Sequence, residues 1–358
     1  MQRVDVQLEG RSYPVLVGAG IIGQASSWSP FLGDGLIVII SNEVVAPLYL
    51  RGVESALDGR AFRHLVLPDG EETKDTTTWS RVIDFLVAEQ AGRDACLIAL
   101  GGGVIGDLCG FAAATYMRGI RFVQVPTTLL AQVDASVGGK TGVNHPRGKN
   151  LIGAFHQPAA VIADTACLRT LPEREFRAGL AEVVKYGAIC DARLLAYLER
   201  HAAALLRLEP DATSQIVLES VRHKADIVAR DEFESGVRAT LNFGHSFAHA
   251  LETLTAYRRY LHGEAVAIGM IVAARLSEQR GLCPPGMAER LASLQQALGL
   301  PVRVPGDLST RDVLECMLLD KKNLAGRRRL ILLRGPGDAV VDEASTDAEI
   351  ARAIDACR

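Results

Sequence analysis

Three histidines lie in residues 245–262, and a carboxylate lies in an earlier segment of helical pattern. His245 and His249 are four residues apart, so on a helix they project from one face, one turn above the other. His262 follows after a short break, and Glu182 belongs to the segment GLAEVVKYG. Catalytic zinc takes three such nitrogen or oxygen ligands and leaves one position open. The pattern predicts a metal site, although an ordinary helix face has the same spacing, and spacing does not decide which of the four is not a ligand.

A glycine-rich turn follows a buried-strand pattern in the segment CLIALGGGVIGDLCG. Gly101, Gly103 and Gly106 fit the spacing G-x-G-x-x-G. Glycines allow the backbone to approach a pyrophosphate, and a helix that begins near Val104 offers free N–H groups and the positive end of its dipole. The segment predicts a dinucleotide site, with a plain glycine turn as the alternative.

Cations accompany two further segments of the first half. Lys140, Lys149 and Asn150 lie among glycines, with Asp134 nearby, and this stretch is interpreted as a loop that wraps an anion or is simply solvated. The segment PDGEETK ends at Lys74 between a strand and a helix, where it could do no more than cap the helix.

The second half adds polar residues close to the predicted metal site. Lys185 follows Glu182 by three residues and shares its helix face. The other such residues of this half are Lys224, Arg238, Asn242 and one of Lys321 and Lys322. Scattered lysines are usually solvated, but the association of these residues with the histidines favours an anionic substrate.

The elements that must position these residues change in kind along the chain. Short β-branched runs alternate with amphipathic helical segments in the first half, which is typical of a parallel sheet covered by helices. From about residue 172 helical periodicity dominates, and RRLILLRGPG is the one strand expected there. We therefore predict an N-terminal α/β, Rossmann-like dinucleotide-binding domain over 1–168 and a mostly α-helical metal-binding domain over 169–358.

Composition narrows the class of protein. The 358 residues are 48% hydrophobic and 23% charged, with a net charge of -3, which predicts a folded protein without a nucleic-acid or membrane surface. The longest apolar run, 265–274, is too short to cross a bilayer, and the N-terminus lacks a signal-like apolar core. Seven scattered cysteines without a C-x-x-C pair indicate a reducing compartment. A cytoplasmic enzyme is expected.

Taken together, the motifs resemble those of the 3-dehydroquinate synthase family of the shikimate pathway. The similarity runs through nearly the whole chain and agrees with an NAD-binding α/β domain followed by a helical domain that carries zinc. The strings that carry it are DGEETK, GGGVIGD, VPTTLLAQVDASVGGKTGVNH, GKNLIGAFHQP, GLAEVVKYG, RATLNFGHSFAHALE and LHGEAVAIGM.

The resemblance implies a role for each matching residue. Glu182, His245 and His262 fall on metal-ligand positions, for zinc or cobalt, and His249 on a substrate position. Arg118 matches an arginine that reaches the neighbouring subunit of a homodimer. Further active-site positions are Asp134, Asn150, Lys185, Lys224, Glu234, Arg238, Asn242 and a lysine of the string Asp320, Lys321, Lys322. The NAD positions are Asp69, Gly70, Glu71, Glu72, Thr73, Lys74, Gly103, Val104, Ile105, Gly106, Asp107, Thr127, Thr128, Lys140, Lys149, Cys167, Leu168, Arg169 and Thr170.

The implied reaction converts 3-deoxy-D-arabino-heptulosonate 7-phosphate to 3-dehydroquinate and phosphate. It proceeds by transient oxidation with NAD, β-elimination of phosphate, re-reduction and intramolecular aldol closure. Lys185, Glu234 and His249 would relay protons through water, and Lys224 with Arg238 would bind the carboxylate. The phosphate would be held by Lys140, Asn150, Arg238, His249 and Arg118.

Three other functions compete with this interpretation. Another sugar phosphate cyclase, such as a 2-epi-5-epi-valiolone or 2-deoxy-scyllo-inosose synthase, would use the same cofactors, but its substrate lacks the carboxylate that Lys224, Arg238 and Asn242 would bind. A metal-dependent polyol dehydrogenase would release NADH and no phosphate. A non-enzymatic NAD-binding scaffold would have no use for the metal ligands and cations.

Overall fold

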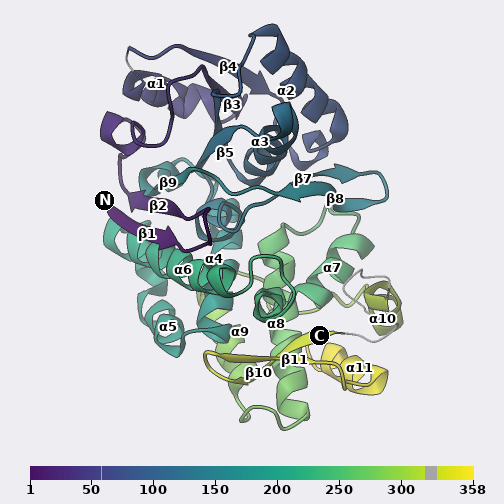
Figure 1. Ribbon diagram of the computed structural model, residues 1–358. Coiled ribbons are helices and arrows are strands. Elements are labelled where there is room, and N and C mark those ends of the chain that lie inside the picture. Colours follow the sequence, from purple (N-terminus) through teal and green to yellow (C-terminus); the bar gives the residue numbers. More distant parts are fainter. Residues whose placement is uncertain (58, 319–328) are drawn as a thin grey trace. The chain divides into compact units, whose positions relative to one another are not determined.

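The computed structural model describes residues 1–57, 59–318 and 329–358, and these form two compact units (Figure 1). The first unit comprises Met1–Leu171 and Thr213–Phe233, and the second comprises Pro172–Ala212 and Glu234–Arg358. The first is built on a mainly parallel sheet and the second is mostly helical, which confirms the predicted fold class.

The first unit contains a seven-stranded sheet in the order β1-β2-β9-β6-β5-β3-β4. Only the β1–β2 pair of this sheet is antiparallel. The strands are β1 (Gln2–Val6), β2 (Tyr13–Gly18), β3 (Ile37–Asn42), β4 (Phe62–Leu67), β5 (Cys96–Gly101), β6 (Arg121–Pro126) and β9 (Ala160–Asp164). The helices are α1 (Ala46–Ala56), α2 (Thr76–Ala88), α3 (Gly103–Thr115) and most of α6 (Pro210–Arg230).

The central strands are apolar on both sides because helices cover both faces of the sheet (Figure 1). Alternate residues of a strand point to opposite faces. Val38 and Ile40 of β3 pack with α2 and α3, whereas Ile37 and Ile39 pack with α1. This two-sided burial explains why the strands appear in the sequence as continuous apolar runs.

A topological switch point lies between β3 and β5, which are neighbours in the sheet. The chain leaves β3 for β4 on one side and leaves β5 for β6 on the other. In open α/β sheets, ligands bind at such a point, beyond the carboxyl ends of the strands. The glycine turn at residues 101–103 follows the carboxyl end of β5.

The second unit packs seven helices and a β-hairpin within its described residues (Figure 1). The long apolar helix α8 contacts α4, α7, α9 and α11. The helices are α4 (Glu173–Ile189), α5 (Ala192–Leu206), α7 (His245–Leu254), α8 (His262–Gln279), α9 (Met287–Ala297), α10 (Thr310–Leu318) and α11 (Asp347–Asp355). The hairpin strands are β10 (Leu330–Gly335) and β11 (Asp338–Asp342).

Two local predictions were wrong. The predicted anion-wrapping loop is largely an antiparallel hairpin, β7 (Lys140–His145) with β8 (Gly148–Phe155), which forms because Gly142 and Gly153 allow the two backbones to approach closely. The predicted single late strand has a partner, β11, because Gly337 adopts a left-handed φ of 77° in the turn that reverses the chain.

Candidate functional site

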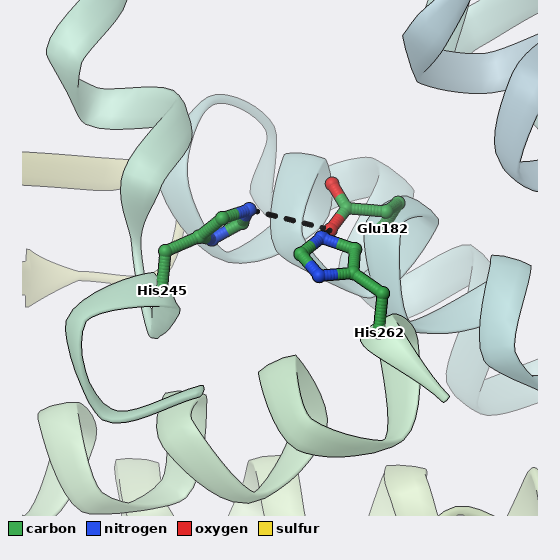
Figure 2. A group of neighbouring side chains, drawn as sticks. All are labelled: Glu182, His245 and His262. Carbon is green, nitrogen blue, oxygen red and sulfur yellow. Dashed lines mark ion pairs between the residues drawn. The ribbon is translucent and has the colours of Figure 1, made fainter. Parts of the chain in front are cut away.

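Glu182, His245 and His262 converge in the second unit from three different helices (Figure 2). Glu182 lies within α4, whereas His245 and His262 are the first residues of α7 and α8. The Nε2 atoms of His245 and His262 lie 3.7 and 3.8 Å from Glu182 Oε1, respectively. The three potential ligand atoms lie within 4.8 Å of one another, which is a suitable spread for one metal ion.

The other ring nitrogen of each histidine faces an oxygen acceptor. His245 Nδ1 lies 3.1 Å from the carbonyl oxygen of Phe243, and His262 Nδ1 lies 3.3 Å from Glu252 Oε1. Metal-binding histidines characteristically donate their second N–H to a carbonyl or carboxylate, which leaves the first nitrogen with a lone pair. The two contacts therefore favour tautomers whose Nε2 atoms can bind a cation beside Glu182.

Glu182 is a fully buried carboxylate that forms an ion pair with Lys185. Neither of its oxygens accepts a hydrogen bond from the described residues. A buried carboxylate in that condition is costly unless positive charge balances it, and a divalent cation would satisfy its second oxygen. The predicted juxtaposition of Lys185 with Glu182 is confirmed.

Burial and charge act in opposite directions on His262. Burial acts to lower the pKa of its imidazole, but the hydrogen bond to Glu252 and the negative charges of Glu252 and Glu182 outweigh burial and raise it. The carboxylates thus make this ring favourable for a positive charge, whether a proton or a metal ion.

Glycines allow the ligand-bearing helices to approach each other. A Cβ atom on Gly263, next to His262, would lie 1.9 Å from the carbonyl oxygen of Ala178 in α4. Gly244, next to His245, has a left-handed φ of 79°, and a Cβ there would lie 2.7 Å from the backbone nitrogen of Met270 in α8. Larger residues at these two positions would separate the helices that carry the ligands.

An ion pair between an arginine and a glutamate fixes the start of α8 against α4. Arg174 donates from Nε and Nη2 to the two oxygens of Glu264, each at 2.7 Å. Glu264 also accepts from the N–H of Leu261 at 2.8 Å, which caps the first turn of the helix. Because His262 lies in that turn, the bidentate pair restricts where its imidazole can be.

Four other predicted site residues lie in the same unit. The Asn242 side chain donates to Glu234 Oε1 at 2.8 Å, and Glu234 has a left-handed φ of 59°. Arg238 is 1% exposed, an unusual degree of burial for a guanidinium. The ring of His249 lies edge-on to that of His245, with 5.8 Å between centroids. Asp320, Lys321 and Lys322 lie outside the described residues.

In the first unit, α3 begins at the predicted glycine turn. Gly102 is its N-cap residue and makes no side-chain cap, so the first N–H groups of the helix lack a side-chain acceptor. Among the three motif glycines, a Cβ on Gly101 would lie 2.8 Å from the Ile105 side chain and one on Gly106 would lie 2.8 Å from Gln124 Oε1, whereas one on Gly103 would make only an ordinary contact of 3.5 Å with Ala135. Close packing therefore favours glycine most clearly at Gly101.

Lys74 connects three of the segments that the sequence singled out. It is 4% exposed, pairs with Asp107 in α3 and donates to Asn150 Oδ1 of β8 at 2.7 Å. Burial raises the pKa of Asp107, and the ammonium of Lys74 opposes that rise. The interpretation of PDGEETK as a helix cap was wrong, because Asp75, one residue later, caps α2 by accepting from the Thr78 N–H at 2.8 Å.

A second buried lysine lies in the same unit. Lys224 of α6 donates to Asp134 Oδ1 at 2.8 Å and also to the backbone oxygen of Asp134. Lys140 and Lys149 are exposed on the β7–β8 hairpin.

Other predicted nucleotide positions lie near the ends of strands. Asp69, after β4, accepts a hydrogen bond from Asn42 at the end of β3. The Thr127 N–H donates to the oxygen of Gly101 at 3.0 Å. Within Cys167–Thr170, the oxygen of Cys167 accepts from Tyr49 of α1 at 3.1 Å. Arg118, predicted for a neighbouring subunit, is exposed and has a φ of 67°.

Nothing in the sequence indicated roles for Phe243 and Asn42, and no role was predicted for Glu252. Only Glu252 could have been found from its spacing, because it follows His245 by seven residues and His249 by three and therefore shares their helix face. Phe243 contacts His245 through its backbone oxygen, which every residue type has.

The fold places the chain in the class of sugar phosphate cyclases. A solved 2-epi-5-epi-valiolone synthase from Streptomyces hygroscopicus subsp. jinggangensis 5008, with NAD+ and Zn2+ bound, superposes with a TM-score of 0.90 at 31% identity and covers 98% of each chain. A 2-deoxy-scyllo-inosose synthase, complexed with carbaglucose-6-phosphate, NAD+ and Co2+, superposes with a TM-score of 0.91 at 25% identity over all of both chains.

The sequence then specifies the family. Residues 64–178 match the profile of the 3-dehydroquinate synthase N-terminal region, and residues 179–323 match that of the C-terminal region. The 3-dehydroquinate synthase of Pseudomonas aeruginosa PAO1 is 51% identical over 341 residues, which is 95% of this chain and 93% of that protein. The chain belongs to the 3-dehydroquinate synthase family.

The described helices include none that is both long enough and apolar enough to span a membrane.

Proposed function

We propose that this protein converts 3-deoxy-D-arabino-heptulosonate 7-phosphate to 3-dehydroquinate and inorganic phosphate. The observation that carries the proposal is the 51% identity to a 3-dehydroquinate synthase over 95% of the chain. The identity to the 2-epi-5-epi-valiolone synthase is lower, at 31%, which favours this reaction over that of the rival cyclase. The resemblance between the motifs and this family supports the same choice.

We propose that Glu182, His245 and His262 hold a divalent metal, zinc or cobalt. The donor set suits either ion, and Glu182 Oε1, which faces the two Nε2 atoms and accepts no hydrogen bond from the described residues, fits a cation. The bound ion would act as a Lewis acid toward oxygens of the substrate. Lys185, paired with Glu182, can hold a proton beside those oxygens.

We propose that the glycine turn at the start of α3 binds the pyrophosphate of NAD. Support comes from the bare N-terminus of the helix, its place after β5 at the switch point, and the glycines that keep side chains away. NAD would accept a hydride and return it in the same turnover. The NAD and substrate roles implied by the resemblance for the remaining residues belong to this proposal.

Two buried cations support an anionic substrate. Lys224 is 6% exposed and Arg238 is 1% exposed, and the resemblance assigns both to the substrate carboxylate. Lys224 is already paired with Asp134 within the protein. The support for an anionic substrate is therefore that both cations match positions that the family uses for the substrate carboxylate, which a cyclase whose substrate lacks that carboxylate would not need.

We further propose that the enzyme works as a homodimer in the cytoplasm, with Arg118 contributing to the partner's site. The exposed turn that carries Arg118 and the seven free cysteines fit this proposal. The two units would serve as the NAD-binding and metal-binding domains predicted from the sequence.

The test is a paired measurement of both products. Purified protein with NAD, Zn2+ and 3-deoxy-D-arabino-heptulosonate 7-phosphate should release phosphate and dehydroquinate in equal amounts without net NADH, and a chelator should abolish both. His262→Ala should be inactive. The matched control His201→Ala should retain activity, because the hydrogen bond and the ring contact of His201 are both with Tyr197 of the same helix, α5.

Each rival predicts a different result in that assay. Turnover of sedoheptulose 7-phosphate instead would identify another cyclase, and net NADH from a polyol would identify a dehydrogenase. Binding of NAD without turnover of any of these compounds would identify a non-enzymatic protein.

A further inference from the structure

We infer that Glu252 is a positioning residue that fixes the tautomer and orientation of His262. The inference rests on the metal site proposed above. Glu252 lies in α7, two turns after His245, and its Oε1 is 3.3 Å from His262 Nδ1. Helix α7 thus contributes one histidine to the site and orients the other, which belongs to α8.

The two histidines are constrained by different means. His245 has a side chain 11% exposed, and its Nδ1 contacts the carbonyl oxygen of Phe243, two residues away on its own backbone. His262 has a side chain 34% exposed, and its Nδ1 contact comes from another helix. His262 therefore has more freedom to rotate or to change tautomer, and the Glu252 carboxylate is the contact that opposes both.

Burial makes the carboxylate suited to this task. The Glu252 side chain is 6% exposed, so its charge is poorly screened by water where it faces the imidazole. An acceptor on Nδ1 requires the proton to be there, which leaves the Nε2 lone pair directed toward Glu182 Oε1, 3.8 Å away. The negative charge also makes Nε2 a stronger donor to a metal.

Three variants test the inference. Glu252→Gln keeps the shape and an oxygen acceptor but removes the charge. Glu252→Asp keeps the charge but shortens the side chain by about 1.5 Å, which breaks the hydrogen bond. The matched control is Glu278→Gln, because Glu278 is an equally buried carboxylate of the same unit, 8% exposed, that pairs with Arg275.

The readouts are the Zn2+ and Co2+ dissociation constants, measured by competition with a chromophoric chelator, and the visible absorption of the Co2+ protein. We expect about 10-fold weaker binding for Glu252→Gln and about 100-fold for Glu252→Asp, with an altered Co2+ spectrum in both. NAD affinity and the thermal unfolding of the metal-free protein should stay near wild type, and Glu278→Gln should bind metal normally.

Wild-type affinity and an unchanged spectrum in both Glu252 variants would overturn the positioning role and leave the proposed metal site intact. An equal loss of affinity in Glu278→Gln would also overturn it, because the loss would then follow from removing any buried carboxylate. If the wild-type protein bound no stoichiometric Co2+, the metal site itself would fail and the positioning role with it.

Discussion

Replacing Gly263 by alanine should displace a metal ligand without touching any ligand atom. The added Cβ would lie 1.9 Å from the Ala178 oxygen and 2.6 Å from its carbonyl carbon. Both are backbone atoms, so no side-chain rotation relieves the collision. To reach an ordinary contact, the start of α8 must move from α4 by about 1.5 Å, and His262 moves with it.

The expected effect on metal binding follows from the narrow range of metal–ligand distances that a metal site accepts. Functional metal–ligand distances hold within about 0.2 Å, so a shift of this size removes His262 from the ligand set. We expect Zn2+ affinity to fall at least ~100-fold, because loss of a ligand exceeds the loss of a supporting contact. Overpacking should also destabilise the fold by ~1–3 kcal/mol, which lowers the melting temperature by several degrees.

The assay is chelator competition with Zn2+ and Co2+, together with thermal unfolding of the metal-free protein. The control is Gly306→Ala, because among the described residues no heavy atom beyond its chain neighbours lies within 4 Å of a Cβ at that position. Normal metal affinity in Gly263→Ala would refute the argument that this close approach places the ligand. A lower melting temperature with normal affinity would confine the role of Gly263 to packing.

Three further outcomes follow from the structure. Zn2+ at 100 times its dissociation constant should stabilise the metal-free protein by ~2.7 kcal/mol, measured by denaturant unfolding, and a chelator should reverse this. Lys74→Met should cost about 1–3 kcal/mol of unfolding free energy at pH 7, because it leaves the carboxylate of Asp107, whose side chain is 21% exposed, without its cation. Burial already raises the pKa of Asp107, and loss of Lys74 should raise it further. The cost of the substitution should therefore shrink as the pH falls and the carboxyl becomes protonated. A cost that did not depend on pH would contradict this. Burial raises the pKa of Cys96 to about 12, so a thiol reagent at pH 8 should modify Cys96 far more slowly than the partly exposed Cys190, as mass spectrometry can establish.

Within the first unit, the sheet could be predicted from the sequence better than the β7–β8 hairpin. Its central strands bury both faces, so each appears as a short apolar run bounded by turns, and helices separate them. The β7–β8 hairpin has neither signal. Glycines and polar residues interrupt the apolar residues of both strands, and β8 is exposed or half-exposed throughout, so the pattern resembles a loop. Its strands pair because Gly142 and Gly153 meet backbone to backbone, a contact that composition does not reveal.

The metal cluster shows where local spacing stops being informative. His245 and His249 share a helix face, so either could point at a metal, and their spacing alone treats them as equal. What separates them is position relative to α4 and α8: the Nε2 of His245 lies 3.7 Å from Glu182, whereas His249 is not among the three clustered residues. That position depends on Gly244 and Gly263, which set how closely the helices approach. Helix packing therefore decides which histidine is a ligand. Residue spacing cannot predict that packing, so the sequence could indicate the ligand only through its similarity to a whole family.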